Sequence, residues 1–161
     1  MKLKYLTWLP AAVILIAIFL FSSKTAEVSQ ESSLGISIAI IQLYDHIKNL
    51  PLQGPEKMKL LALIDHIVRK TAHFTEYACL AAAIAFHFTV WKKGIHYRTW
   101  IPVLIAGFYA ATDEFHQTFV AGRSGQVSDV LLDTAGAATG AFLFCILLLL
   151  INRFKQGRSM L

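Results

Sequence analysis

Charged residues are scarce in this chain of 161 residues: Asp, Glu, Lys and Arg make up 16% of it, and 56% is hydrophobic. A soluble domain of this length carries nearer a quarter charged residues, so the composition excludes an ordinary water-soluble domain. The basic residues form no stripe with interleaved aromatics, which argues against a nucleic-acid partner. The two cysteines, Cys79 and Cys145, fall in apolar runs at different depths, so no disulfide is expected between them.

Four stretches lack charge altogether: Tyr5 to Ser23, Tyr77 to Trp91, Thr99 to Thr112 and Thr134 to Asn152. A helix rises about 1.5 Å per residue, so crossing the hydrocarbon takes roughly 20 mostly apolar residues. The first and last stretches nearly reach that length, and the middle two reach it when neighbouring polar residues enter the membrane. The sequence therefore predicts an all-α polytopic membrane protein, a bundle of four transmembrane helices. It forms a single domain over 1–161, with spans at about 5–23, 70–91, 99–120 and 129–151.

The basic residues predict the orientation of these spans. If the N-terminus is cytoplasmic, the inner side holds Lys2, Lys4, Lys92, Lys93, Arg98, Arg153, Lys155 and Arg158. The short outer loop then holds only Arg123, and the basic residues of the long outer loop are offset by acids. We therefore expect a multi-pass protein of the plasma membrane with both termini in the cytoplasm. The first run is longer than the apolar part of a signal peptide and lacks a clear cleavage site, so it is interpreted as an uncleaved anchor.

The outer loop, 24–69, is the one sizeable segment outside the predicted membrane spans. Apolar residues repeat in it at helical spacing, and Pro55 is well placed to open a second helix. The two sets are Ile36, Ile40, Leu43, Ile47 and Leu50, then Leu60, Leu61, Ile64, Ile67 and Val68. These patterns predict two short amphipathic helices, which either lie on the membrane surface or pack on the bundle as a cap.

Ionisable residues of three spans fall at one predicted depth, within roughly 10 Å of the outer boundary given the rise of a helix. They are Arg69, His73 and Glu76 in the second span, Asp113, Glu114, His116 and Gln117 in the third, and Asp129 and Asp133 in the fourth, with Arg123 in the short loop. Charges facing lipid are costly, so these side chains should face one another or water. Taken singly, the aspartates can be helix N-terminal residues favoured by the dipole, and Arg69 can extend to the interface.

Small residues lie below this polar cluster. Gly136 and Gly140 form a G-x-x-x-G on the face that carries the two aspartates, which lets another helix approach closely. Gly107, Ala110 and Ala111 offer a similar surface below Glu114. The sequence therefore predicts a cleft in the outer leaflet, with a close-packed floor and an open top.

Two segments, "RKTAHFTEYACLA" (69–81) and "DEFHQTFVAGRSGQVSDVLLDTAGAATG" (113–140), resemble the VanZ-like family of small bacterial membrane proteins. The "FLFSSKTA" that ends the first span is also similar to that family, whose pattern has asparagine where this chain has Asp133. The resemblance implies action at the outer face of the cell envelope and a contribution to resistance to the glycopeptide teicoplanin. It implies a setting near lipid-linked wall precursors and brings no reaction with it.

Three functions are compatible with the cluster. A binding module would hold the acidic end of a membrane lipid, a lipid-linked precursor or a lipoglycopeptide on Arg123, with Arg69, Lys70 and His73 near the rim, since the guanidinium fork suits phosphate. An enzyme would use His73, Glu76, Glu114 and His116 as acid, base or metal ligands, although "HFTE" matches no strong zinc signature and no cofactor is assigned. A transporter is disfavoured because the acids lie on the outer side and not at the midplane.

Overall fold

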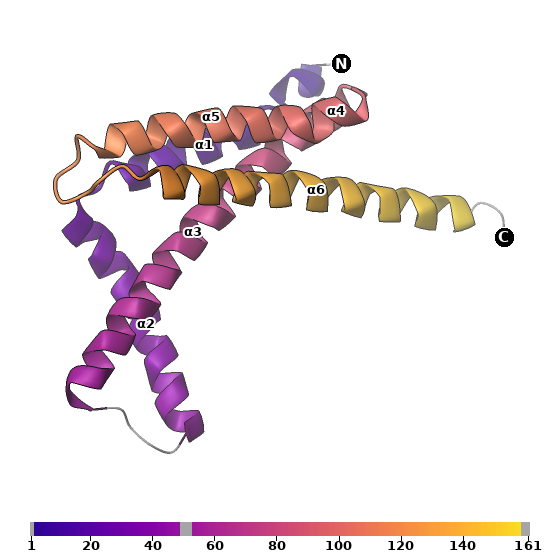
Figure 1. Ribbon diagram of the computed structural model, residues 1–161. Helices are drawn as coiled ribbons and strands as arrows, with labels where there is room; N and C mark the ends of the chain where they lie inside the picture. The colour runs from indigo at the N-terminus through magenta and orange to yellow at the C-terminus, as the bar shows by residue number, and fades with distance from the viewer. Residues whose placement is uncertain (1, 49–52, 159–161) are drawn as a thin grey trace.

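A computed structural model describes residues 2–48 and 53–158 of the chain. They form η1 (Lys2–Leu6), α1 (Leu9–Ser22), α2 (Ala26–Lys48), α3 (Gly54–Val90), α4 (Ile95–Arg98), α5 (Trp100–Gln117) and α6 (Val127–Arg158) (Figure 1). No strand occurs in these two ranges, which confirms the all-α prediction. Pro10 and Pro55 stand in the first helical turns of α1 and α3, where a missing amide hydrogen costs nothing.

The bundle consists of α1, the C-terminal half of α3, α5 and α6, with α3 in contact with each of the others. Its core combines large side chains of α3 and α1 with alanines of α5 and α6. The buried members are Tyr77, Leu80, Ala81 and Ile84 of α3, Ala11 and Ile18 of α1, Ala106 and Ala110 of α5, and Ala137 and Ala141 of α6. Small residues on α5 and α6 allow the helix axes to approach closely.

The G-x-x-x-G of α6 packs directly on the backbone of α3. A Cβ atom at Gly136 would lie 2.3 Å from the carbonyl oxygen of Phe74, and one at Gly140 would lie 1.9 Å from that of Ala78. This confirms the predicted close approach below the polar residues. On α5, Ala110 is buried as expected but Ala111 is exposed, so the small surface of that helix does not extend to Ala111.

The long loop differs from its prediction. Its first part forms a separate helix, α2, which begins shortly after α1. Its second part is helical too, but it is continuous with the helix of the predicted second span. Residues 54–69 instead run without interruption into the rest of α3, because no proline or glycine stands between Pro55 and Val90 to end the helix. We call α2 together with residues 54–69 of α3 the arm; it projects sideways from the bundle in Figure 1 and does not cap it.

The apolar face of α2 is exposed, whereas a helix that packs on protein through its apolar face buries it. Three residues of α2 are buried, Ser33, Ser37 and Ile41, whereas the predicted apolar face is exposed. The exposed residues of that face are Ile36, Ile40, Leu43 and Ile47, and Leu50 lies outside the described residues.

In the part of the chain that the structure describes, two segments are long and apolar enough to cross a membrane, Lys4–Ser22 and Val127–Gln156. They correspond to the first and fourth predicted spans, although α6 continues beyond residue 151. The predicted second and third spans fall on the C-terminal half of α3 and on α5, which carry most of the polar cluster.

Candidate functional site

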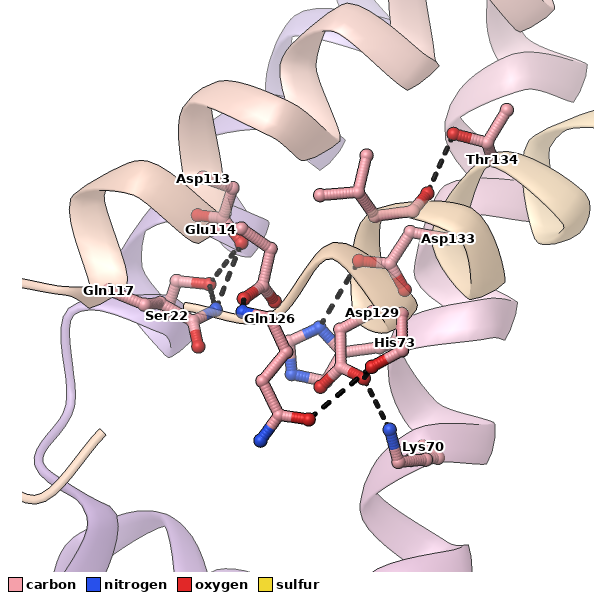
Figure 2. A network of polar contacts seen from close by, with 12 residues as sticks. Ser22, Lys70, His73, Asp113, Glu114, Gln117, Gln126, Asp129, Asp133 and Thr134 are labelled. Carbon is pink, nitrogen blue, oxygen red and sulfur yellow. Dashed lines mark hydrogen bonds and ion pairs between the residues drawn. The ribbon is translucent and has the colours of Figure 1, made fainter. Parts of the chain in front are cut away.

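The predicted polar residues gather at the end of the bundle where α1 and α5 end, α6 begins and α3 enters from the arm (Figure 2). We call this the polar end. It divides into a hydrogen-bonded network between α1 and α5, a loop contact between α5 and α6, and ion pairs between α3 and α6.

The network between α1 and α5 is buried. The hydroxyl of Ser22 donates to Oδ2 of Asp113 at 2.6 Å. The amide nitrogen of Gln117 donates to the same carboxylate oxygen and to Oγ of Ser22, each at 3.2 Å. Asp113 is only 4% exposed, so its carboxylate depends on these two donors in place of water. This part of the cluster joins two helices, and of its three residues only Gln117 also lines a cavity described below.

Ser22→Ala should therefore destabilise the bundle. It removes a donor from a buried carboxylate, a loss expected to cost about 1–3 kcal/mol of unfolding free energy. The neighbouring Ser23 is the matched control, because it is exposed and its hydroxyl donates to the carbonyl of Phe19, its one side-chain hydrogen bond among the described residues. Ser23→Ala should change stability by less than about 0.5 kcal/mol. Thermal unfolding of both variants in detergent checks this, and equal midpoints for the two variants would contradict it.

Glu114 holds the turn between α5 and α6. Its Oε2 accepts a hydrogen bond from the backbone nitrogen of Gln126 at 2.9 Å. The preceding Gly125 passes so close to α5 that a Cβ atom there would lie 2.5 Å from the carbonyl oxygen of Glu114. The carboxylate thus fixes the loop that carries Arg123, and it also lines a cavity.

Two pairs join α3 to α6. Lys70 forms an ion pair with Asp129, and Nδ1 of His73 lies 3.9 Å from Oδ2 of Asp133. The side chain of Asp133 is only 1% exposed, and neither of its oxygens accepts a hydrogen bond from the described residues. Both predicted aspartates of α6 therefore face basic residues of α3, and Asp129 also stands in the first turn of α6, where the helix dipole favours a carboxylate.

Arg69 is held by an acid that the sequence interpretation missed. Its Nε lies 3.4 Å from Oδ2 of Asp65, one helical turn earlier on α3. Asp65 is buried in the arm, where the hydroxyl of Ser33 donates to its Oδ1 at 2.5 Å and that of Ser37 lies at 3.5 Å. The spacing of Asp65 and Arg69 by four residues was a signal available in the sequence. The serines of α2 were not, because their position depends on how the arm folds.

Two cavities open at the polar end. One, of about 260 Å³, is bordered by basic and acidic side chains; the other, of about 240 Å³, has a more apolar lining. The polar cavity is lined by His66, Lys70, Glu114, Gln117, Ser124, Gln126, Asp129 and Asp133, among others. The apolar cavity is lined by Phe21, Lys24, Ser32, Ser33, Ile36, Val68, Ala72 and Glu76. Both cavities share Ser29, Arg69, His73 and Arg123, so these four side chains form a common wall.

Arg123 is the basic residue of this wall that carries no ion pair within the described part of the chain. Its backbone nitrogen donates to the carbonyl of Val120 at 3.1 Å, which fixes the turn. Burial lowers the pKa of the guanidinium, while the Asp113 carboxylate raises it. A guanidinium is effectively always protonated in proteins, so the side chain is charged at neutral pH. The structure thus places a charged, unpaired guanidinium between the two cavities.

Not every predicted residue reaches the cavities. His116 faces α1, with its ring centroid 5.2 Å from that of Phe19. Glu76 lines only the apolar cavity. Within residues 2–48 and 53–158, no three His, Cys, Asp or Glu side chains are grouped so that they could hold a metal ion.

Comparison with known proteins identifies one family. The sequence model of the family described as VanZ/LLP1 matches residues 7–149, which include α1, α3, α5, the part of α6 up to residue 149 and every residue of the polar end. No curated protein and no solved structure matches the chain.

Proposed function

Since the chain belongs to the VanZ/LLP1 family, we propose that it is a membrane protein that binds a lipid-linked or lipidated anionic ligand at the outer face of the bacterial cell membrane. In this proposal, binding contributes to resistance to teicoplanin-type glycopeptides. The observation that carries the proposal is the wall of Ser29, Arg69, His73 and Arg123 shared by a polar and an apolar cavity. A ligand with an acidic head and an apolar chain would place its junction at this wall.

The polar cavity suits an anion because two of the three acids that line it, Asp129 and Glu114, already have partners, and the third, Asp133, is buried beside a basic residue. Asp129 is paired with Lys70, Glu114 accepts from the backbone of Gln126, and Asp133 faces His73. Arg123 is left to meet a ligand, and its planar fork of donors matches phosphate or carboxylate.

The apolar cavity suits a hydrocarbon chain. Phe21 of α1, Ile36 of α2, and Val68 and Ala72 of α3 line it. Burying apolar surface stabilises a complex by about 25 cal/mol per Å². Teicoplanin carries an acyl chain, so the same arrangement would serve a lipid or the antibiotic.

We further propose four spans, formed by α1, the C-terminal half of α3, α5 and α6, with both termini in the cytoplasm and the polar end outside. The opposite end supports this placement. It carries Lys4 over the ring of Trp91 at 4.2 Å, and Tyr5 against Trp91 at 5.5 Å, the aromatic and basic residues typical of a membrane interface.

Cysteine labelling from outside intact cells should reach Ser124→Cys and miss Gly94→Cys, in a background with Cys79 and Cys145 replaced by alanine. Ser124 is exposed at the polar end, and a Cβ atom at Gly94 meets nothing within 4 Å, so both cysteines should be tolerated. Ser124 is a better site than Gly125, where a side chain would strike α5. Labelling at position 94 with none at 124 would reverse the orientation.

The resistance part of the proposal predicts a difference between two antibiotics. Expression in a sensitive host should raise the inhibitory concentration of teicoplanin more than that of vancomycin, because only the former offers an acyl chain to the apolar cavity. Equal shifts for the two, or no shift at equal membrane abundance, would contradict it.

One observation favours a second function, an enzyme that modifies an envelope lipid. His73 lies 3.9 Å from a buried carboxylate, Asp133, and lines both cavities, as a general acid or base held by an acidic partner would. The two functions differ in what leaves the protein. A binding protein returns its lipid chemically unchanged, and mass spectrometry of lipid recovered after incubation with the purified protein would distinguish the two.

A further inference from the structure

In the arm, apolar side chains lie on the exposed surface and polar ones lie in the contact between its two helices. A segment surrounded by water is expected to have the opposite arrangement. Seven large apolar side chains of α2 are exposed, and four of them share one helical face: Ile36 at 57%, Ile40 at 41%, Leu43 at 59% and Ile47 at 68%. The contact with α3 instead uses Ser33, Ser37 and Ile41. In water, apolar burial would favour the reverse arrangement.

The cavities show that the arm has two chemically different flanks. Ile36 of α2 and Val68 of α3 border the apolar cavity, whereas His66 and Lys70 of α3 border the polar one. Ile40, Leu43 and Ile47 follow Ile36 at spacings of four, three and four, so they continue its face along α2. The apolar cavity and the exposed face of α2 are thus one continuous apolar surface, which we call the apolar flank.

The direction of the arm fits a bilayer surface. Figure 1 shows α5 and α6 running side by side, with the arm leaving them steeply at the polar end. Because the arm projects to the side of α5 and α6, it would run along a bilayer that these two helices cross.

We propose that the apolar flank of the arm docks on lipid, with the arm lying in the interface of the outer leaflet. This inference rests on the membrane setting of the proposed function, and it adds the path by which a lipid reaches the two cavities. Interfacial helices bury their apolar faces about 5–10 Å into the boundary between headgroups and chains. At that depth the apolar cavity opens to acyl chains and the polar cavity to headgroups, so a lipid ligand enters sideways from the leaflet and not from water.

Depth-resolved quenching on the full chain tests this without a ligand. Single cysteines are placed at Ile40 or Ile47, with Cys79 and Cys145 replaced by alanine, labelled with bimane and reconstituted in phosphatidylcholine–phosphatidylglycerol vesicles. Glu31 and Gln42 are the matched control positions, because both are exposed on α2 and lie well over a quarter turn away from Ile36 around the helix.

Nitroxide-labelled acyl chains should quench labels at 40 and 47 at least about threefold more than those at 31 and 42, and aqueous iodide should show the opposite order. Iodide quenching at 40 and 47 as strong as at the controls would place the arm in water and overturn the proposal. Shielding of 40 and 47 from both quenchers would mean that a second copy covers the flank, which also overturns it. The probe needs no ligand, so loss of ligand binding in an Arg123 variant would leave this result unchanged.

Discussion

Gly140→Ala is expected to lower the free energy of unfolding by about 2–3 kcal/mol, and Gly136→Ala by a similar amount. The added methyl groups would lie 1.9 Å from the carbonyl oxygen of Ala78 and 2.3 Å from that of Phe74. These atoms belong to the backbone of α3 and cannot rotate away, so the helices must separate. Alanine's better helix propensity returns only about 1 kcal/mol. Circular dichroism during heating in detergent measures the loss.

Gly35→Ala is the matched control. Gly35 also lies within a helix, but a Cβ atom there meets nothing within 4 Å. The substitution should leave the protein unchanged or stabilise it by up to about 1 kcal/mol. If Gly140→Ala and Gly35→Ala had the same effect, α6 would not pack on α3 as described, and the floor of the polar end would be wrong.

Arg123→Ala should remove resistance while the protein still accumulates in the membrane. Among the described residues no carboxylate lies within ion-pair distance of this guanidinium, so its loss leaves no partner unpaired. A ligand anion would lose charged hydrogen bonds, each worth about 1.5–3 kcal/mol, so binding should weaken at least about tenfold. Arg123→Lys keeps the charge without the fork and should be intermediate.

Arg153→Ala serves as the control, because Arg153 is an exposed base near the opposite end of α6. It should keep both abundance and resistance. Membrane abundance by immunoblot and inhibitory concentration for teicoplanin are measured side by side. Full resistance in Arg123→Ala at normal abundance would refute the anion-binding role and leave the polar cluster as a means of joining helices.

The level at which the polar residues meet was predictable because it depends only on helical rise. His73, Asp113 and Asp133 stand on three different helices, and their positions in the charge-free runs put them at the same end. The packing of Gly136 and Gly140 was predictable for a similar reason, since residues four apart share a face whatever surrounds them.

The arm was not predictable to the same degree. Periodicity correctly grouped Ile36, Ile40 and Ile47 on one face of α2, but it does not tell which face packs on protein. Ser37 is fully buried and Ile47 is exposed, a choice that depends on the surrounding solvent and not on the pattern. The continuity of α3 from 54 to 90, in contrast, has a signal in the sequence, because no proline or glycine stands between Pro55 and Val90 to end the helix.

Several individual side-chain pairings could not be predicted from the sequence either. Lys70 could extend to the interface or pair with an acid, and only the crossing of α3 and α6 brings it to Asp129. The partner of Glu114 is a backbone nitrogen, that of Gln126, which no pattern of residue types can indicate. Ser22 stands in a segment whose family resemblance was visible, yet its bond to Asp113 depends on how α1 lies against α5.

The central claim, that the shared wall binds an amphipathic anion, is tested most directly by native mass spectrometry of protein extracted with its lipids in a mild detergent. The wild-type protein and Arg153→Ala should retain a stoichiometric anionic lipid that dissociates only at high collision energy. Arg123→Ala should lose that lipid while remaining folded. Equal retention of the same lipid by Arg123→Ala, or no retained anionic lipid on the wild-type protein, would contradict the account.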